Sequence, residues 1–297
     1  MMNDKGRQTM KYLLAVDGSD QSLDAVRFFE ALSPAESLKV LHVANVPGIP
    51  YPAMGANVAK DLAMTVERAM KEEGEGVLNQ AESLLPLHSG SLSKLLEVGS
   101  PAELILKMAQ EDNVDLVVMG ARGMGRIQEQ IFGSVSHRVM THAPCSTLLV
   151  KQPVRSIKNL LIPIDSQEDS DAVLSFFKKK PFREACSFTV LHVIPMIDPV
   201  WPVGAMIPQE FRKEIRDYAE KFTRGLCLEL ERLGHEANGV VLEGAPSVTI
   251  VEEIRKTKPD LLVMRPQSQS GVSRFFLGSV SHSVVHHTDC SILLVRE

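Results

Sequence analysis

Short apolar runs alternate with longer amphipathic stretches along the whole chain. In the first half the runs fall at residues 11–16, 38–43, 114–119 and 146–150, with a weaker one at 92–98. They are rich in Val and Leu and do not alternate apolar with polar residues, which is typical of strands buried on both faces of a parallel sheet. The amphipathic stretches between them predict helices. This order predicts a doubly wound α/β fold with right-handed crossovers.

Two of the amphipathic stretches carry apolar stripes at helical spacing. The stripe in the first half comprises Val58, Leu62, Val66 and Ala69, and the one in the second half comprises Phe211, Ile215, Tyr218, Phe222, Leu226, Leu230 and Leu233. Both predict a helix face packed on a sheet. A further helix is expected after Gly99, with Ser100 and Glu103 forming a capping box and Pro101 in the first turn. Ala245 stands at the corresponding cap position of the second half and predicts a weaker start.

The second half of the chain repeats the first, block by block and in the same order. The matching blocks lie 145 to 150 residues apart and include 12–17 with 160–165, 40–43 with 190–193, 115–119 with 260–264, 133–137 with 278–282, and 145–150 with 290–295. Such ordered blocks at a nearly constant separation indicate a duplication. We therefore predict two tandem five-stranded domains, residues 1–152 and 153–297, joined only by the short linker 151–155 and lying close together.

Composition excludes several classes of protein. The 297 residues are 44% hydrophobic and 23% charged, and the formal net charge is −5. A dedicated binder of nucleic acid or of an anionic membrane needs a concentrated basic face, whereas the one short basic run, Lys178-Lys179-Lys180, is interpreted as the solvated end of a helix. No apolar run approaches the 18 or so residues of a membrane span, and the first residues lack a secretory signal. The four cysteines are far apart, so reduced buried thiols are expected in place of a metal or disulfide site, and the cytoplasm is the expected compartment.

Candidate binding residues follow the strands of the first domain, at the sheet edge where ligands of open parallel sheets bind. Gly120 and Gly123 have no Cβ, so their backbone can approach phosphate oxygens closely. Gly133 and Ser134 open a helix whose first N–H groups, on Val135 and Ser136, favour an anion. Asp17 can accept hydrogen bonds from ribose hydroxyls. Arg122 and Arg126 can donate charge-assisted hydrogen bonds to phosphates.

Each of these features also has a plain structural interpretation. A Gly-x-x-Gly after a strand is commonly a turn, Gly-Ser before a helix is commonly a cap, and single arginines are commonly solvated. Asp20 and Asp17 can serve as helix caps. The nucleotide interpretation depends on all the features occurring together at the proper places in the topology.

The pattern Gly120-x₂-Gly123-x₉-Gly133-Ser134 resembles the nucleotide-binding motif of the universal stress protein family. The resemblance covers both halves of the chain. It implies that Asp17 holds the ribose, that Ala15 and Val43 flank the adenine, and that Met119, Gly120 and Gly123 line the phosphate loop. It further implies that Gly133, Ser134, Val135 and Ser136 bind the phosphates of ATP or another adenine nucleotide, with Mg²⁺ or Mn²⁺ bridging them.

The second half departs from the motif at two of its glycines. Arg265 and Ser268 stand in place of Gly120 and Gly123, and Pro266 removes one N–H group. The side chains should obstruct the backbone approach that phosphates need, although Arg265 can also offer its guanidinium to a phosphate. We therefore predict one working nucleotide site in the first domain and one degenerate site in the second. The apolar segment 194–206, with Trp201, either covers the sheet end or binds a hydrophobic ligand or partner.

The resemblance also bears on assembly and role. Family members commonly dimerise through the fifth strand, so the two halves are expected to pair these edges as an intrachain pseudo-dimer, with further homodimerisation open. No catalytic set is visible, and the favoured role is a nucleotide-binding stress-response or regulatory protein with an unknown protein partner. The alternatives are a slow ATPase or other nucleotide-using enzyme, and an interaction scaffold without nucleotide.

Overall fold

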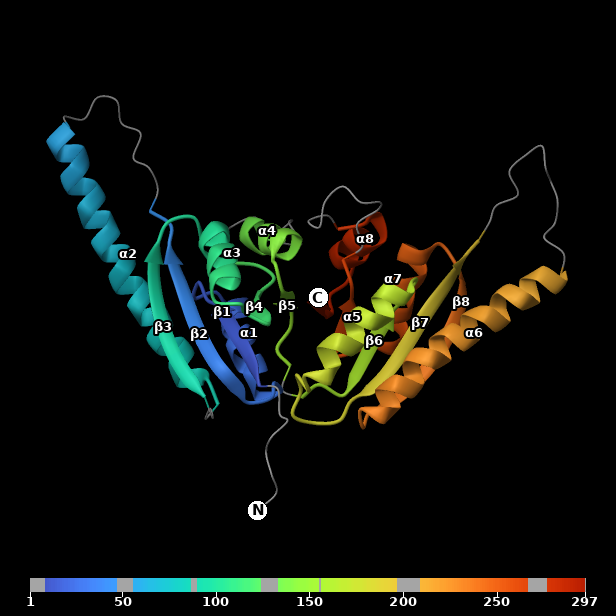
Figure 1. Ribbon diagram of the computed structural model, residues 1–297. Helices are drawn as coiled ribbons and strands as arrows, with labels where there is room; N and C mark the ends of the chain where they lie inside the picture. Colours follow the sequence, from blue (N-terminus) through green and yellow to red (C-terminus); the bar gives the residue numbers. More distant parts are fainter. Residues whose placement is uncertain are drawn as a thin grey trace, which may run out of the picture. The chain divides into compact units, whose positions relative to one another are not determined.

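The chain folds into two compact units, residues 1–155 and 156–297. Figure 1 shows the computed structural model, which describes residues 9–46, 56–86, 90–123, 133–154, 156–196, 209–266 and 277–296. Each unit contains a five-stranded parallel sheet with helices on both faces, as the sequence predicts. No helix in this described part of the chain is both long enough and apolar enough to cross a membrane.

The first unit has the strand order β3-β2-β1-β4-β5. Its strands are β1 (Met10–Ala15), β2 (Ala35–Ala44), β3 (Ser91–Val98), β4 (Leu116–Gly120) and β5 (Ser146–Val150). Its helices are α1 (Asp20–Arg27), followed by the 3₁₀ turn η1 (Phe28–Glu30), then α2 (Ala56–Leu84), α3 (Pro101–Glu111) and α4 (Ser134–His142). Helices α1 and α2 pack together on one face of the sheet, and α3 and α4 pack together on the other.

The second unit repeats this arrangement with the strand order β8-β7-β6-β9-β10. Its strands are β6 (Asn159–Pro163), β7 (Ser187–Pro195), β8 (Glu236–Gly244), β9 (Leu261–Met264) and β10 (Ser291–Leu294). Its helices are α5 (Gln167–Lys178), α6 (Gln209–Arg232), α7 (Pro246–Thr257) and α8 (Ser279–His287). The expected pairing of the two units through β5 and β10 stays a prediction, as does homodimerisation.

The central strands carry the core of each unit. All five residues of β4 are buried, as are all four of β9, which explains why these runs lack polar positions. Tyr12 of β1 meets Phe29 edge to face, with ring centroids 5.5 Å apart. The cysteines are not joined by disulfides, and they are buried at Cys186, Cys227 and Cys290 and half-buried at Cys145.

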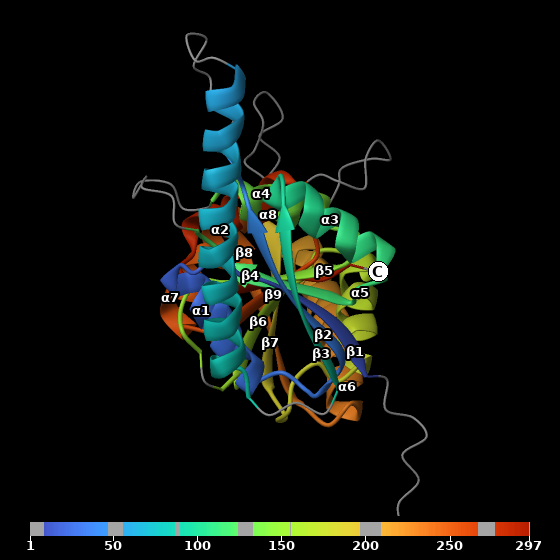
Figure 2. The same cartoon turned by 90° about the vertical axis from the view of Figure 1, so that its left-hand side faces the viewer.

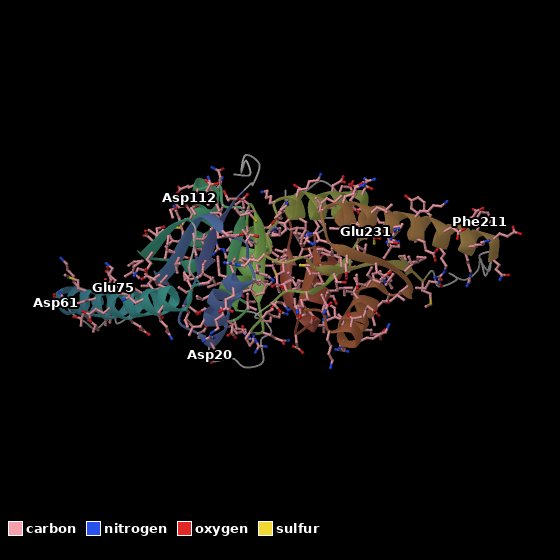
Figure 3. The ribbon with its side chains drawn as sticks, turned by 90° about the horizontal axis from the view of Figure 1, so that it is seen from below. Asp20, Asp61, Glu75, Asp112, Phe211 and Glu231 are labelled. Atoms are coloured by element: carbon pink, nitrogen blue, oxygen red, sulfur yellow. The ribbon has the colours of Figure 1, made fainter. Side chains whose placement is uncertain are left out.

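The apolar stripes on α2 and α6 pack on the sheets over only part of their length. Leu226 and Leu230 are buried, whereas Phe211 and Tyr218 are 57% and 74% exposed, and Leu62 of α2 is 36% exposed. The packed helix face that the sequence predicts therefore extends over only part of each helix. The 24 residues of α6 span about 36 Å, more than the roughly 30 Å of the nine-residue β7, so one end projects. Figure 2 shows the projecting end of α2, and Figure 3 shows Phe211 at the projecting end of α6.

Two helix starts differ from those predicted. Ser19, not Asp20, is the N-cap of α1, and its side chain accepts a hydrogen bond from the Ser22 N–H. Ser100 is the N-cap of α3, with Pro101 in the first turn, but its side chain makes no capping hydrogen bond. The expected partner Glu103 instead pairs with Arg138 of α4, with 3.1 Å between Oε1 and Nη2.

The strand order of the first unit reverses between β1 and β4, which is where open parallel sheets bind ligands. In the register of the sheet, Ala15 lies opposite both Leu41 of β2 and Met119 of β4. The residues that follow these three positions therefore reach the same edge of the sheet. This register brings Asp17, Val43 and Gly120 together.

Candidate functional site

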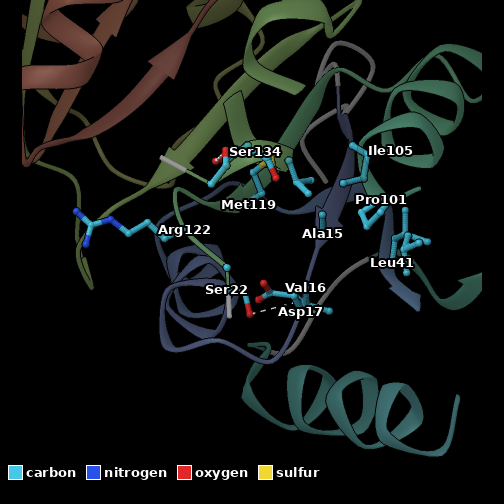
Figure 4. A pocket seen from close by; sticks show the side chains of 16 residues that line it. Ala15, Val16, Asp17, Ser22, Leu41, Pro101, Ile105, Met119, Arg122 and Ser134 are labelled. Carbon is cyan, nitrogen blue, oxygen red and sulfur yellow. Dashed lines mark hydrogen bonds between the residues drawn. The ribbon is translucent and has the colours of Figure 1, made fainter. Parts of the chain in front are cut away.

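A cavity of about 380 Å³ opens at this edge of the first unit. Every predicted site residue within the described residues lines it: Ala15, Asp17, Val43, Met119, Gly120, Arg122, Gly123, Gly133, Ser134, Val135 and Ser136. Figure 4 shows the side chains that line this cavity. Its volume is in the range that small-molecule sites occupy. The predicted residue Arg126 lies outside the described residues.

Asp17 is held in place by the turn that connects β1 to α1. Its Oδ1 accepts hydrogen bonds from the Ser19 N–H at 3.0 Å and the Ser19 hydroxyl at 2.6 Å. Its own N–H points to the Ser22 hydroxyl oxygen, 3.4 Å away (Figure 4). Gly18 between them has φ +83°, a left-handed conformation that glycine adopts without strain. The turn therefore fixes Oδ1, and Oδ2 faces Gly123 in the loop after β4.

Gly120 and Gly123 are required by contacts within the protein. A Cβ on Gly120 would lie 2.8 Å from the backbone of Gln21 and Ser22, so the glycine lets β4 pack closely against the start of α1. A Cβ on Gly123 would collide with Asp17 Oδ2. The sequence interpretation ascribed both glycines to phosphate approach. In the structure each glycine allows two segments of the site to pack closely. Gly120 brings β4 against the start of α1, and Gly123 brings the loop after β4 against Asp17.

The loop after β4 is tied to α1 through Gln21. The Arg122 N–H donates to Gln21 Oε1 at 2.7 Å, and Ser19 Oγ lies 3.4 Å from the Arg122 carbonyl oxygen. Arg122 is exposed, and Figure 4 shows its side chain extending away from Asp17 and Met119. Both of these contacts are made by the backbone of Arg122.

The start of α4 forms the opposite wall. Gly133 is its N-cap and provides no capping side chain, so the N–H groups of the first turn face the cavity edge. The buried Ser136 hydroxyl lies 2.6 Å from the Ala121 carbonyl oxygen and 3.0 Å from that of Gly133. Ser136 thus anchors the helix start to the end of β4. Ser134 is exposed and offers its hydroxyl at the same wall.

The remaining wall is apolar. Leu41, Pro101 and Ile105 belong to it. Together with Val16 and Ser22, they are the five lining residues that the sequence did not predict. Pro101 and Ile105 lie on one face of the first turns of α3, so only the helix assignment combined with the sheet topology would have found them. Figure 4 shows them beside Leu41, on the side away from Arg122. The cavity therefore has an apolar side and a side rich in backbone N–H groups and hydroxyls.

The second unit has a much smaller cavity, of about 90 Å³, at the same place. Its walls keep an apolar side, with Leu191, Val193, Ile250 and Met264. Arg265 stands where the first unit has Gly120, and it pairs with Asp169 of α5. Ser268 and the segment around Trp201 lie outside the described residues.

Comparison with known proteins agrees with this architecture. The family model described as "Universal stress protein family" matches residues 9–151 and again 156–296. The chain is 32% identical over 152 residues to universal stress protein YxiE of Bacillus subtilis, which covers 48% of this chain and 98% of that protein. It is 23% identical over 298 residues to a universal stress protein of Mycolicibacterium smegmatis, with 96% of each chain covered.

Among solved structures, a universal stress protein from Archaeoglobus fulgidus matches 96% of this chain and 97% of its own, with a TM-score of 0.63 and 18% identity. That match concerns the fold. Because the family model covers nearly the whole chain in two consecutive matches, the chain belongs to the universal stress protein family and contains its domain twice.

Proposed function

We propose that the first unit binds an adenine nucleotide such as ATP, and that the bound nucleotide serves a stress-response or regulatory role. The observation that carries this proposal is the cavity of about 380 Å³ around Asp17, Gly123 and the start of α4. It combines an apolar side suited to a base with a carboxylate suited to ribose hydroxyls and helix N–H groups suited to phosphates.

The residues present fit such a ligand. Val43 and Ile105 supply apolar surface for a purine ring, and Asp17 Oδ2 is directed to the loop side of the cavity. The N-cap of α4 is Gly133, which has no side chain of its own to compete with a phosphate for the N–H groups of the first turn. A divalent cation would offset the charge of the phosphates, and the exposed Ser134 hydroxyl at the helix start would help to hold it.

Native mass spectrometry of the full chain, with the nucleotide identified after denaturation, tests the proposal. We expect one ATP or ADP per chain, retained from expression or taken up from added Mg-ATP. Gly123→Ala puts a methyl group against Asp17 Oδ2, and Asp17→Ala removes the carboxylate, so both should release the nucleotide. The matched control is Ser279→Ala, because Ser279 holds the place of Ser134 at the start of α8 in the second unit.

A folded wild-type chain that carries no nucleotide and takes up none from Mg-ATP would overturn the proposal. Two nucleotides per chain, with one lost in Ser279→Ala, would place binding in both units and would contradict the assignment to the first unit alone. Circular dichroism of each variant separates loss of ligand from loss of fold.

A further inference from the structure

Arg265 and Asp169 form an ion pair inside the second unit that has no counterpart in the first. Arg265 Nε lies 2.9 Å from Asp169 Oδ1, and the two side chains are 30% and 4% exposed. At the matching positions the first unit has Gly120 after β4 and Ser22 as the third residue of α1. Both partners of the pair thus differ from the first unit, and they differ together.

Backbone hydrogen bonds hold the carboxylate of Asp169 in this position. Its Oδ2 accepts hydrogen bonds from the N–H groups of Asp165 and Ser166, at 2.9 and 3.0 Å, and it completes the capping box of α5. Because one oxygen is fixed to the backbone, the other stays aimed at Arg265. The guanidinium is therefore neutralised by a group that the fold itself holds in place.

The pair also changes the cavity at the edge of the sheet. Asp165, Asp169 and Arg265 are its charged lining residues within the described part of the unit, so carboxylates exceed guanidinium groups there. The cavity measures about 90 Å³, against about 380 Å³ in the first unit. Arg265 donates its Nε–H to a carboxylate that is almost fully buried, so an anion that approached the other N–H groups would meet a guanidinium whose charge is already compensated. It would also lie near the carboxylates of Asp165 and Asp169, which repel it.

We propose that the Arg265–Asp169 pair sets the ligand selectivity of the second unit, so that its cavity excludes phosphate-bearing and other anionic ligands and takes only small uncharged ones. Under the proposed function, the first unit receives the phosphates at the N–H groups that begin α4. In the second unit, the positive charge of Arg265 is already compensated by Asp169. The apolar walls formed by Val193, Ile250 and Met264 are left to contact an uncharged molecule.

Isothermal titration calorimetry of the full chain with pyrophosphate tests this inference. Asp169→Asn keeps an oxygen for the capping hydrogen bonds but frees the guanidinium of its counter-charge. We expect this variant to bind one more pyrophosphate per chain than the wild type, roughly tenfold or more tighter than any uptake by the second unit of the wild type. Adding Arg265→Met should abolish the gain. Asp165→Asn removes the other carboxylate of the cavity and should produce no comparable gain.

Asp169→Ser, which installs the residue of the first unit, is an independent variant should the asparagine form fail to fold. Two folded variants that bind no more pyrophosphate than the wild type would overturn the inference. So would a wild-type chain that loses a bound pyrophosphate on Arg265→Met. Pyrophosphate bound by the wild type reports the first unit, whereas the additional pyrophosphate bound by the Asp169 variants reports the second. Failure of the nucleotide proposal and failure of this inference are therefore distinguished.

Discussion

His42 of β2 lies with its Nδ1 2.9 Å from the carbonyl oxygen of Val16, the residue before Asp17. A carbonyl only accepts, so Nδ1 carries the proton and the tautomer is fixed. His192 makes the same contact with Ile164 in the second unit, also at 2.9 Å. Each histidine ties the second strand of its unit to the end of the first, at the position where the site begins.

His42→Leu should therefore act on both stability and ligand binding. It leaves the Val16 carbonyl without this donor, which costs about 1–3 kcal/mol in free energy of unfolding. It also loosens the turn that aims Asp17, so nucleotide affinity should fall. His192→Leu is the matched control, with a similar loss of stability in urea denaturation and unchanged nucleotide affinity. Equal affinities in the two variants would contradict a positioning role for His42.

Sequence patterns predicted the fold well because they report local burial. The strands at 38–43 and 146–150 and the duplication depend on runs of apolar residues that one segment carries by itself. The need for glycine at position 120 could not be predicted in the same way. It arises from close contact with the backbone of Gln21, which is about a hundred residues away along the chain. The Arg265–Asp169 pair likewise joins residues 96 positions apart.

The candidate site shows the same difference between features carried by one segment and features that depend on distant segments. The sequence predicted the residues after β1 and β4 because those loops carry a recognisable motif. Pro101 and Ile105 have no motif and enter the cavity only because α3 packs beside β2. Helix length relative to strand length decides which residues of a stripe are covered, and the apolar pattern of α6 does not encode it.

Two glycines of α2 should respond oppositely to alanine. A Cβ on Gly76 meets nothing within 4 Å, so Gly76→Ala should stabilise the first unit by about 0.5–1 kcal/mol through helix propensity. A Cβ on Gly74 would lie 2.6 Å from His42 Cδ2 and 2.7 Å from Leu96 Cδ1, so Gly74→Ala should destabilise by about 1–3 kcal/mol. Urea denaturation measures both, and effects of the same sign would show that α2 is not seated on His42.

The two halves of α6 should differ in their sensitivity to truncation. Leu230 is fully buried, so Leu230→Ala should lower the free energy of unfolding by about 2–5 kcal/mol. Phe211 is 57% exposed on the projecting end, so Phe211→Ala should change it by no more than about 0.5 kcal/mol. Thermal and urea denaturation of both variants provide the comparison. A large loss in Phe211→Ala would mean that another surface covers this end of the helix in solution.

The thiols should differ in reactivity. Burial raises the pKa of Cys186 to about 12, and the negative charges of Asp260 and Glu184 add to the rise. The reactive thiolate is therefore almost absent at neutral pH. Cys145 is only half-buried, so a thiol reagent should label it first in the native chain, with Cys186 reacting after denaturant is added. Peptide mapping by mass spectrometry follows each site, and early labelling of Cys186 would contradict its burial.

His235 should make the second unit less stable in mild acid. Burial lowers the pKa of His235 below its ordinary 6.5, and the charge of Lys180 lowers it further. Its Nδ1 accepts the Cys186 N–H at 3.2 Å, and its ring meets Phe188 edge to face, so the native state favours the neutral imidazole. As the pH falls below about 6.5, the unfolded chain takes up the proton first, and stability is lost until the pH passes the lower native pKa.

The melting temperature should therefore fall between about pH 7 and pH 5, and His235→Phe should reduce that slope because phenylalanine does not titrate. His142→Gln is the control, since His142 is exposed. Histidine resonances followed by NMR give the native pKa directly. A native pKa at or above 6.5 would contradict the argument, because protonation would then cost the folded unit nothing and the Cys186 N–H would have to find its acceptor elsewhere.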